Sequence, residues 1–462
     1  RNYPSNAMLP TSCTSSPIEK ENNGKGARAA FRRKIILSGG LCALVIFLLF
    51  SIAANGNDNH DDDGTTTGVV GKIKHIEEVR KGKGGVKQKF RGLKPMMNNA
   101  FTDEEKLQKI LSASVHLVDL HVSEGQLMGN GDSYGTVQGV FCSLDWATHK
   151  KDPSANAMFR ELVTESPDCT HNRFMMDIKT VIDAALEHDL ESQDVKVLQP
   201  TGFVFHESRC GSTLVANSLA AFAPERSRVY TESTPPASVL VACPSGRCNK
   251  DKQADLFSDV LYLMGRTNDL KEEHLFFKFQ SITSLNIDVA RLAFPSVPWI
   301  YVYRDPVQVL MSHLHPITNA VCLKHKRKPK RETQALIQRV VQRNAQSLSS
   351  EDFCAAHLAS LCENALHETK TSGTGRMVNY DTLPDILMED IIPNYFLSED
   401  GTFGEREKEN IRRVSGTYSK GRHGETKAWV EDSDKKDRAA SDKIRQAAAT
   451  FLQSSFDAFR DL

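Results

Sequence analysis

Along residues 201–303, short apolar runs alternate with longer segments whose apolar residues recur at helical spacing. The runs predict strands at 203–205, 229–231, 275–279 and 299–303, and a helix is predicted at 212–222, directly after the first strand. Strands and helices that alternate in this way are typical of a parallel sheet with helices on its faces. We therefore predict an α/β fold with its ligand site at the carboxyl ends of the strands.

The pattern before residue 201 is less regular. Thr102, followed by Asp-Glu-Glu, is a typical helix start, and the apolar stripe after it predicts a helix that runs to about Val122. Alternation over 137–144 predicts a short strand or loop, and 175–188 predicts a second helix. We therefore treat residues 101–200 as a lead-in subdomain, whose role the sequence does not define. Residues 201–462 form the predicted main domain.

One apolar run is much longer than the others. Residues 35–54 form about twenty residues without a charge, which is enough to cross a bilayer as a helix. Arg and Lys precede this run and Asp follows it, so the positive-inside rule predicts a type II anchor with a cytoplasmic tail at 1–34. The alternative is a signal sequence cleaved after Ala53. Residues 55–100, rich in Gly, Asp, Thr and Lys, predict a disordered stem.

Charge and cysteine content narrow the choice of partner and compartment. Lys plus Arg and Asp plus Glu both number 58, which argues against a general nucleic-acid binder. Eight of the ten cysteines follow the apolar run. In an oxidising compartment Cys243 and Cys248 would close a small loop, whereas buried reduced thiols are the alternative. No Cys/His set has zinc-site spacing, so we predict no metal.

Residues 201–220 combine features of a phosphate site. A buried strand leads into a turn of small residues and then a helix, so the amides near Gly211, Ser212 and Thr213 and the helix N-terminus can bind a phosphate, with Arg209 as a cation. Gly and Lys of a nucleotide-triphosphatase loop are replaced by His206 and Ser212, which disfavours a Mg²⁺-triphosphate site. An ordinary strand-turn-helix with a capping Ser is the alternative.

A second segment, 297–314, also runs from a strand into a helix. The strand ends at Arg304, Pro306 opens the helix, and Ser312 follows two helical turns later. Alone, this Arg-Asp helix start is equally typical of a cap with a salt bridge.

Together these two segments resemble the sulfotransferase superfamily, in which a P-loop-like segment binds the 5′-phosphosulfate of 3′-phosphoadenosine 5′-phosphosulfate (PAPS). SRCGSTL, residues 208–214, is similar to the Pro-Arg-Ser-Gly-Thr-Thr-Leu segment of Golgi members, except that Ser208 replaces the Pro and Cys210 the Ser. Arg304 and Ser312 match the family's Arg and Ser that bind the 3′-phosphate. The cosubstrate contacts implied by this resemblance are Arg209, Cys210, Gly211, Ser212, Thr213, Arg304 and Ser312.

The resemblance, which covers about residues 200–430, also implies catalytic roles. Glu232 stands where some members carry the general base, and Lys278 where the family carries a Lys facing the leaving phosphate oxygen. The alternatives are that Glu232 only caps a helix and that Lys278 only extends its charged end to solvent. If Glu232 is not the base, His313 or His315 is the next candidate. Tyr380 and the Lys420-Gly421-Arg422 loop match later family segments.

These observations predict a PAPS-dependent sulfotransferase that needs no metal. The resemblance implies a Golgi protein with a lumenal catalytic domain and an acceptor that offers a hydroxyl on a glycan, a tyrosyl side chain or a small alcohol. Two other classes stay open. One is a catalytically silent membrane protein that binds a nucleotide or glycan, and the other is a P-loop kinase or nucleotide hydrolase, which would need Mg²⁺.

Overall fold

Five parallel strands form the main sheet, and they include the four strands predicted from the apolar runs. The computed structural model describes residues 97, 100–129, 131–315, 320–398, 403–417, 428 and 430–462. The strands are β5 Pro200–His206, β6 Ser227–Thr231, β8 His274–Lys278, β9 Trp299–Tyr303 and β10 Gly375–Asn379. Their order is β10-β9-β5-β8-β6, and every neighbouring pair is parallel. The predicted parallel sheet is therefore confirmed.

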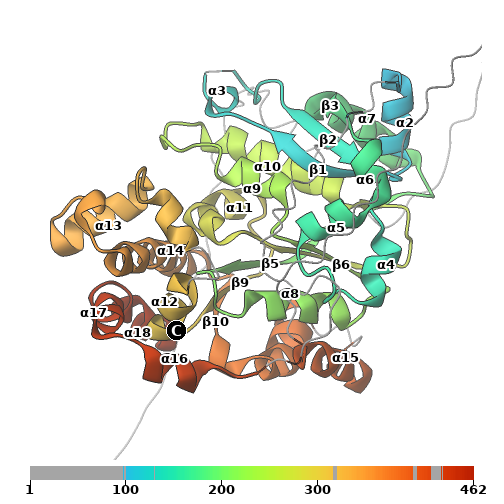
Figure 1. Ribbon diagram of the computed structural model, residues 1–462. Helices are drawn as coiled ribbons and strands as arrows, with labels where there is room; N and C mark the ends of the chain where they lie inside the picture. Colours follow the sequence, from blue (N-terminus) through green and yellow to red (C-terminus); the bar gives the residue numbers. More distant parts are fainter. Residues whose placement is uncertain are drawn as a thin grey trace, which may run out of the picture. The chain divides into compact units, whose positions relative to one another are not determined.

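Helices cover both faces of this sheet (Figure 1). On one face lie α8 Ser212–Ala221, the π-helix η6 Leu387–Phe396 and α15 Glu405–Ser415. On the other lie α9 Thr234–Leu240, α10 Lys250–Gly265, α11 Ile287–Ala293 and α14 Ser350–Ser372. Side chains alternate between the faces, so Phe203 and Phe205 of β5 belong to one hydrophobic cluster and Val204 to the other. A sheet buried on both faces has the continuous apolar strands that the sequence shows.

A smaller antiparallel sheet precedes the main one. It consists of β1 His116–His121, β2 Gln138–Cys142 and β3 Phe174–Asp177, in that order. Of the short strand or loop predicted at 137–144, the structure forms the strand, β2. The predicted helix at 175–188 begins later, as α7 Ile178–Glu191, because its first residues pair with β2 as β3. One hydrophobic cluster joins residues of this sheet, such as Phe141, to Phe203 of the main sheet.

The predicted helix from Thr102 to Val122 is wrong in its second half. Thr102 caps α2 Asp103–Leu111 through a reciprocal capping box with Glu105, as the sequence indicated. The helix ends at Leu111 with Ser112 as its C-cap, Ala113 takes a left-handed conformation, and β1 begins at His116. The apolar residues of this stretch fit both a helical stripe and a half-buried strand, and pairing with β2 decides between them.

The remaining elements complete the covering layers and loops. They are α3 Glu124–Leu127, α4 Trp146–Lys151, α5 Phe159–Glu165, α6 Pro167–His171, β4 Lys196–Val197, β7 Arg266–Thr267, η1 Ser281–Asn286, α12 Pro306–Leu314, η3 Val321–His325, α13 Arg331–Val341, η4 Ala345–Ser347, η5 Tyr380–Thr382, α16 Ser433–Ala439, α17 Asp442–Phe451 and α18 Gln453–Arg460. Within the described ranges, no helix combines the length and the apolar character needed to cross a membrane. The predicted anchor at 35–54 and the cytoplasmic tail lie outside these ranges, as does the predicted stem except for Met97 and Ala100.

Candidate active site

The turn between β5 and α8 is held in an unusual backbone conformation. Ser208, Arg209 and Gly211 all have positive φ angles, of 84°, 57° and 84°. Left-handed conformations in non-glycine residues cost about 1 kcal/mol or more each and concentrate at functional sites. His206, at the end of β5, fixes the turn because its Nδ1 accepts a hydrogen bond from the Ser208 amide at 2.9 Å. The turn leads into the N-terminus of α8, and backbone amides at a helix N-terminus favour an anion.

Gly211 is required at its position for a second reason. A Cβ atom added there would come within 2.5 Å of the Tyr380 ring, so only glycine allows the two to pack. The same ring lies under the guanidinium of Arg304, with 4.0 Å between the Arg304 Cζ atom and the ring centroid. Tyr380 therefore joins the two segments that resemble the sulfotransferases by touching one residue of each. A cation over an aromatic face contributes about 0.5 to 2 kcal/mol.

Arg304 is almost completely buried and is positioned by several contacts. It follows β9 directly, and Asp305 then caps α12 by accepting hydrogen bonds from the amides of Val307 and Gln308. The Arg304 Nε donates to Gln308 Oε1 at 2.8 Å, and its Nη2 approaches Asp432 and Ser433. Ser312, on α12, lines the same pocket as Arg304. The structure thus brings together the Arg and Ser paired by the sequence.

A buried carboxyl group ties the two strand ends together. Glu207 Oε1 accepts the backbone N–H of Arg304 at 2.6 Å, and its Oε2 accepts from the Cys362 thiol at 3.4 Å. Burial, followed by smaller effects of its hydrogen bonds and of nearby charges, raises the pKa of Glu207 to about 8. Glu207 is therefore largely protonated at neutral pH. Sequence reasoning missed this residue because nothing distinguishes it from a polar residue at a strand end.

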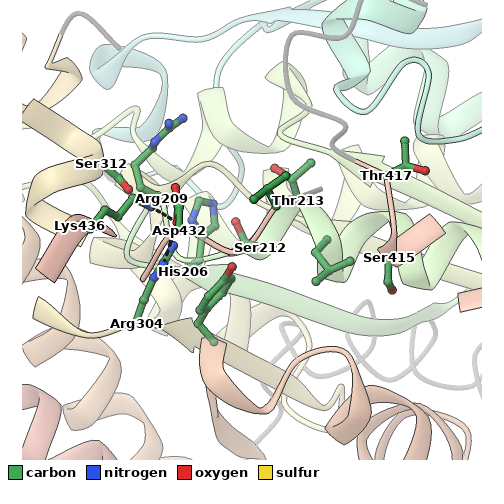
Figure 2. Close-up of a pocket in the computed structure, with 14 residues that line it drawn as sticks. His206, Arg209, Ser212, Thr213, Arg304, Ser312, Ser415, Thr417, Asp432 and Lys436 are labelled. Carbon is green, nitrogen blue, oxygen red and sulfur yellow. Dashed lines mark hydrogen bonds and ion pairs between the residues drawn. The ribbon is translucent and has the colours of Figure 1, made fainter. Parts of the chain in front are cut away.

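One cavity of about 170 Å³ lies where these groups meet. Its lining residues are His206, Arg209, Gly211, Ser212, Thr213, Leu214, Arg304, Ser312, Tyr380, Ser415, Thr417, Val430, Asp432 and Lys436. Figure 2 shows Ser312, Arg304, Asp432 and Lys436 gathered at one end, with Ser415 and Thr417 at the other. Six of the seven residues predicted to contact the cosubstrate line this cavity.

Cys210 is the predicted contact that does not line the cavity. Its side chain is fully buried and belongs to the hydrophobic cluster beneath α8. Burial is the main cause that raises the pKa of this thiol to about 12, so the side chain is a neutral apolar group. The structure therefore places the Cys210 side chain outside the cavity, and a contact between this residue and the cosubstrate stays a prediction. In this turn, where the resemblance places a Ser in other members, the small thiol packs inward.

The predicted catalytic pair lies farther along the same sheet edge. Lys278 ends β8, and Glu232 follows β6 by one residue with a positive φ of 54°. The Lys278 Nζ donates to Glu232 Oε1, and the Glu232 amide donates to the Lys278 carbonyl oxygen. The two residues form an ion pair in which Lys278 is buried and Glu232 is partly exposed, and neither lines the 170 Å³ cavity. The structure therefore pairs Glu232 with Lys278 outside the cavity, whereas most of the residues predicted to bind phosphate line it.

The other candidates from the sequence differ in position. Tyr380 lines the cavity, whereas His313 and His315, the replacement bases, do not. The Lys420-Gly421-Arg422 loop lies outside the described residues. Sequence reasoning missed Asp432 and Lys436, because the run EDSDKKD that contains them has the composition of a solvated surface helix. No local signal would have found them.

Six cysteines of the described part are paired. The disulfides are Cys142–Cys169, Cys243–Cys248 and Cys322–Cys354, while Cys210 and Cys362 are free and buried. The predicted pair Cys243–Cys248 is therefore present. Within the described ranges, the one cluster with metal-ligand geometry is Glu124 with these two cysteines, and their sulfurs are bonded to each other.

Comparisons with known proteins give a weak likeness. No protein-family model and no curated protein matches the chain. Among solved structures, the sulfotransferase domain of an olefin synthase from Synechococcus PCC 7002 matches with 15% identity over 55% of this chain and 95% of that domain, at a TM-score of 0.30. A sulfotransferase from Mycobacterium avium matches with 11% identity over 77% of this chain and 97% of that one, at a TM-score of 0.36. Scores this low do not establish a shared function, which has to be inferred from the pocket.

Proposed function

We propose that this chain is a sulfotransferase that moves a sulfuryl group from PAPS to an acceptor hydroxyl. The observation that carries the proposal is the shared cavity. The turn before α8 and the Arg304/Ser312 pair are far apart in the sequence, yet both line it. PAPS carries anionic groups on both the 5′ and the 3′ side of its ribose. In the proposed complex the turn binds the 5′-phosphosulfate, and Arg304 with Ser312 binds the 3′-phosphate.

The order of the strands supports a direction for the transfer. Along the sheet the sequence of neighbours is β9, β5, β8 and β6, which carry Arg304, the phosphate-binding turn, Lys278 and Glu232 at their carboxyl ends. Neighbouring strands lie about 4.8 Å apart. A nucleotide that lies across β9 and β5 would point its sulfuryl group toward Lys278, with Glu232 beyond it. This is the order in which leaving group, sulfur and acceptor meet in an in-line displacement.

The proposed chemistry follows from these positions. The acceptor oxygen bonds to sulfur while the bond from sulfur to the phosphate oxygen breaks, and the hydroxyl proton passes to Glu232. Lys278 and the amides of the turn stabilise the charge that develops on the leaving phosphate. Because a sulfuryl group carries less negative charge than a phosphoryl group, cations and amides of the protein suffice for this role in the proposal. The ion pair between Glu232 and Lys278 holds the proposed base next to the proposed partner of the leaving phosphate.

A direct assay tests the proposal. The full chain, solubilised in detergent, would be incubated with PAPS labelled in its sulfur, and with glycans, tyrosyl peptides and small alcohols as acceptors. We expect label in at least one acceptor class, with no requirement for Mg²⁺. Hydrolysis of ATP that depends on Mg²⁺, without sulfuryl transfer, would contradict the proposal and favour a nucleotide hydrolase.

A silent nucleotide-binding protein is the second candidate. It is favoured by one observation, that Glu232 and Lys278 are engaged with each other and lie outside the cavity. Tight binding of adenosine 3′,5′-bisphosphate (PAP) with no transfer to any acceptor would support it.

We also propose that the chain is a single-pass type II membrane protein of the Golgi with a lumenal catalytic domain. The charge step around residues 35–54 supports the anchor. Three disulfides in the described part support an oxidising compartment, because such bonds are rare in the cytosol.

A further inference from the structure

A carboxylate occupies one end of the candidate nucleotide site. Asp432 Oδ1 lies 3.2 Å from Arg304 Nη2, the group assigned above to the 3′-phosphate. The same Asp432 oxygen accepts a hydrogen bond from Lys436 Nζ at 2.7 Å. Ser433 Oγ accepts a further hydrogen bond from Arg304 Nη2, at 2.8 Å. Figure 2 shows Asp432 between Arg304 and Lys436 at this end of the cavity.

The surrounding charges are those of a site for an anion. Arg209, Arg304 and Lys436 all line the cavity. Burial lowers the pKa of Lys436, the hydrogen bond and charge of Asp432 oppose this, and the charges of Arg304 and Arg209 lower the pKa further. Burial alone would raise the pKa of Asp432, but the contacts with Lys436 and Arg304 outweigh it and the pKa is lowered. Asp432 is thus an ionised carboxylate that offsets part of this positive charge.

The helix that follows Asp432 and carries Lys436 is not buried against the rest of the protein. None of the residues of α16, Ser433–Ala439, is buried. Besides the contacts at Arg304, α16 is held by a hydrogen bond of 3.1 Å from Gln308 Nε2 to Asp437 Oδ2 and by one from Arg445 Nη2 to the Asp437 carbonyl oxygen. An element with few buried apolar contacts can move at small cost in free energy. The Asp432 side chain is itself 47% exposed, so its carboxylate can move away from Arg304 into water.

A phosphate cannot join this arrangement without a change. Two negative groups a few ångströms apart repel each other, and they do so more strongly near a protein surface than in bulk water. The Arg304 Nη2 group, moreover, already donates to Asp432 and Ser433. A dianionic phosphate at Arg304 and the carboxylate of Asp432 therefore compete for the same donors.

We propose that Asp432 is a resident carboxylate that the 3′-phosphate of the nucleotide replaces at Arg304, so that α16 shifts and Lys436 passes from Asp432 to the phosphate. This inference rests on the proposed function, since it requires a nucleotide with a 3′-phosphate. It assigns Lys436 as a third cation of the phosphate site and Asp432 as the residue that sets its affinity. The exchange is one of anions, and no covalent bond changes.

Calorimetry on the full chain in detergent tests this exchange, with PAP as the ligand. Asp432→Asn removes the competing charge and keeps the shape, so we expect it to bind PAP about tenfold more tightly than the parent. Lys436→Ala should bind PAP about tenfold more weakly. Asp434→Asn is the matched control, because Asp434 is an exposed carboxylate of the same helix outside the cavity, and its affinity should stay within about twofold.

A second ligand separates exchange from a merely structural role. Adenosine 5′-monophosphate lacks the 3′-phosphate, so Asp432→Asn should not improve its binding. If Asp432 only held Arg304 and Lys436 in place, the same substitution would leave PAP affinity unchanged or weaken it, and the inference would be overturned. A gain of equal size for both nucleotides would also overturn it. Failure of both the parent and Asp432→Asn to bind PAP would instead count against the proposed function.

Discussion

Arg304 combines a charge, an aromatic contact and a buried position, so its removal is the most direct probe of the proposed phosphate site. We expect Arg304→Ala to weaken PAP binding by about 2 to 4 kcal/mol, the scale of a lost charge-assisted phosphate contact. The PAP affinity of Arg304→Lys should fall between those of the parent and Arg304→Ala, because a lysine keeps the charge but loses the planar donor over Tyr380. Calorimetry would measure both, with Arg339→Ala, which removes an exposed ion pair with Glu363, as the control. Unchanged affinity in Arg304→Ala would remove the basis of the site.

Glu207 makes a distinct prediction about pH. Its pKa rises from an ordinary value of 4.5 to about 8 on folding. Between these values the unfolded chain releases a proton that the folded chain keeps, so the folded state loses stability as pH increases. At about 1.4 kcal/mol per pKa unit, the loss is roughly 2 to 5 kcal/mol, complete above about pH 8. Glu207→Gln retains an acceptor for the Arg304 amide and should lack this loss.

Urea unfolding of both proteins between pH 5 and pH 8.5 measures the effect. Other titrating groups are common to the two, so the difference in unfolding free energy isolates Glu207. Parallel pH profiles for the parent and Glu207→Gln would show that this carboxyl group does not titrate as described.

At the scale of elements, the turn before α8 meets two requirements at Gly211: a backbone with positive φ, and room for the Tyr380 ring. Gly211→Ala places a methyl group against the Tyr380 ring and strains a residue with positive φ, whereas Gly373→Ala strains a residue of φ 68° with no atom near its Cβ position. We expect Gly373→Ala to cost about 1 kcal/mol in unfolding free energy with no change in PAP affinity. Gly211→Ala should cost more and should also weaken PAP binding at least tenfold. Equal effects of the two on both measurements would contradict the role assigned to Tyr380.

The elements also show which parts of the structure the sequence could reveal. Strands β5, β6, β8 and β9 were predictable because burial on both faces makes them continuous apolar runs. Strand β1 was mistaken for helix because its pairing partner, β2, decides its conformation. The turn and the Arg304/Ser312 pair were found by residue type and spacing. Asp432 and Lys436 were not, because only the folded chain brings that polar segment to the cavity.

For the whole molecule, the proposed topology predicts which part of the chain is protected in the cell. In sealed microsomes, added protease should remove only the short N-terminal tail and leave a large fragment. That fragment should contain the three disulfides, with Cys210 and Cys362 unmodified by alkylating reagents until it is unfolded. Peptide mapping under non-reducing conditions measures both. Digestion of the fragment in intact vesicles would reverse the topology, and a chain that begins near Asn55 would favour a cleaved signal.

The position of the site within the chain bears on how the protein is made. Synthesis is vectorial, and the cavity draws on β5, then β9, then η5, and finally α16. A growing chain therefore completes the central strand long before it has the side chains that close the far end of the cavity. A nucleotide that binds the finished site cannot stabilise these intermediates, since ligands stabilise only states that bind them. Until α16 has been made, folding of the nascent chain relies on its hydrophobic clusters and disulfides, and the proposed nucleotide can stabilise the chain only after that point.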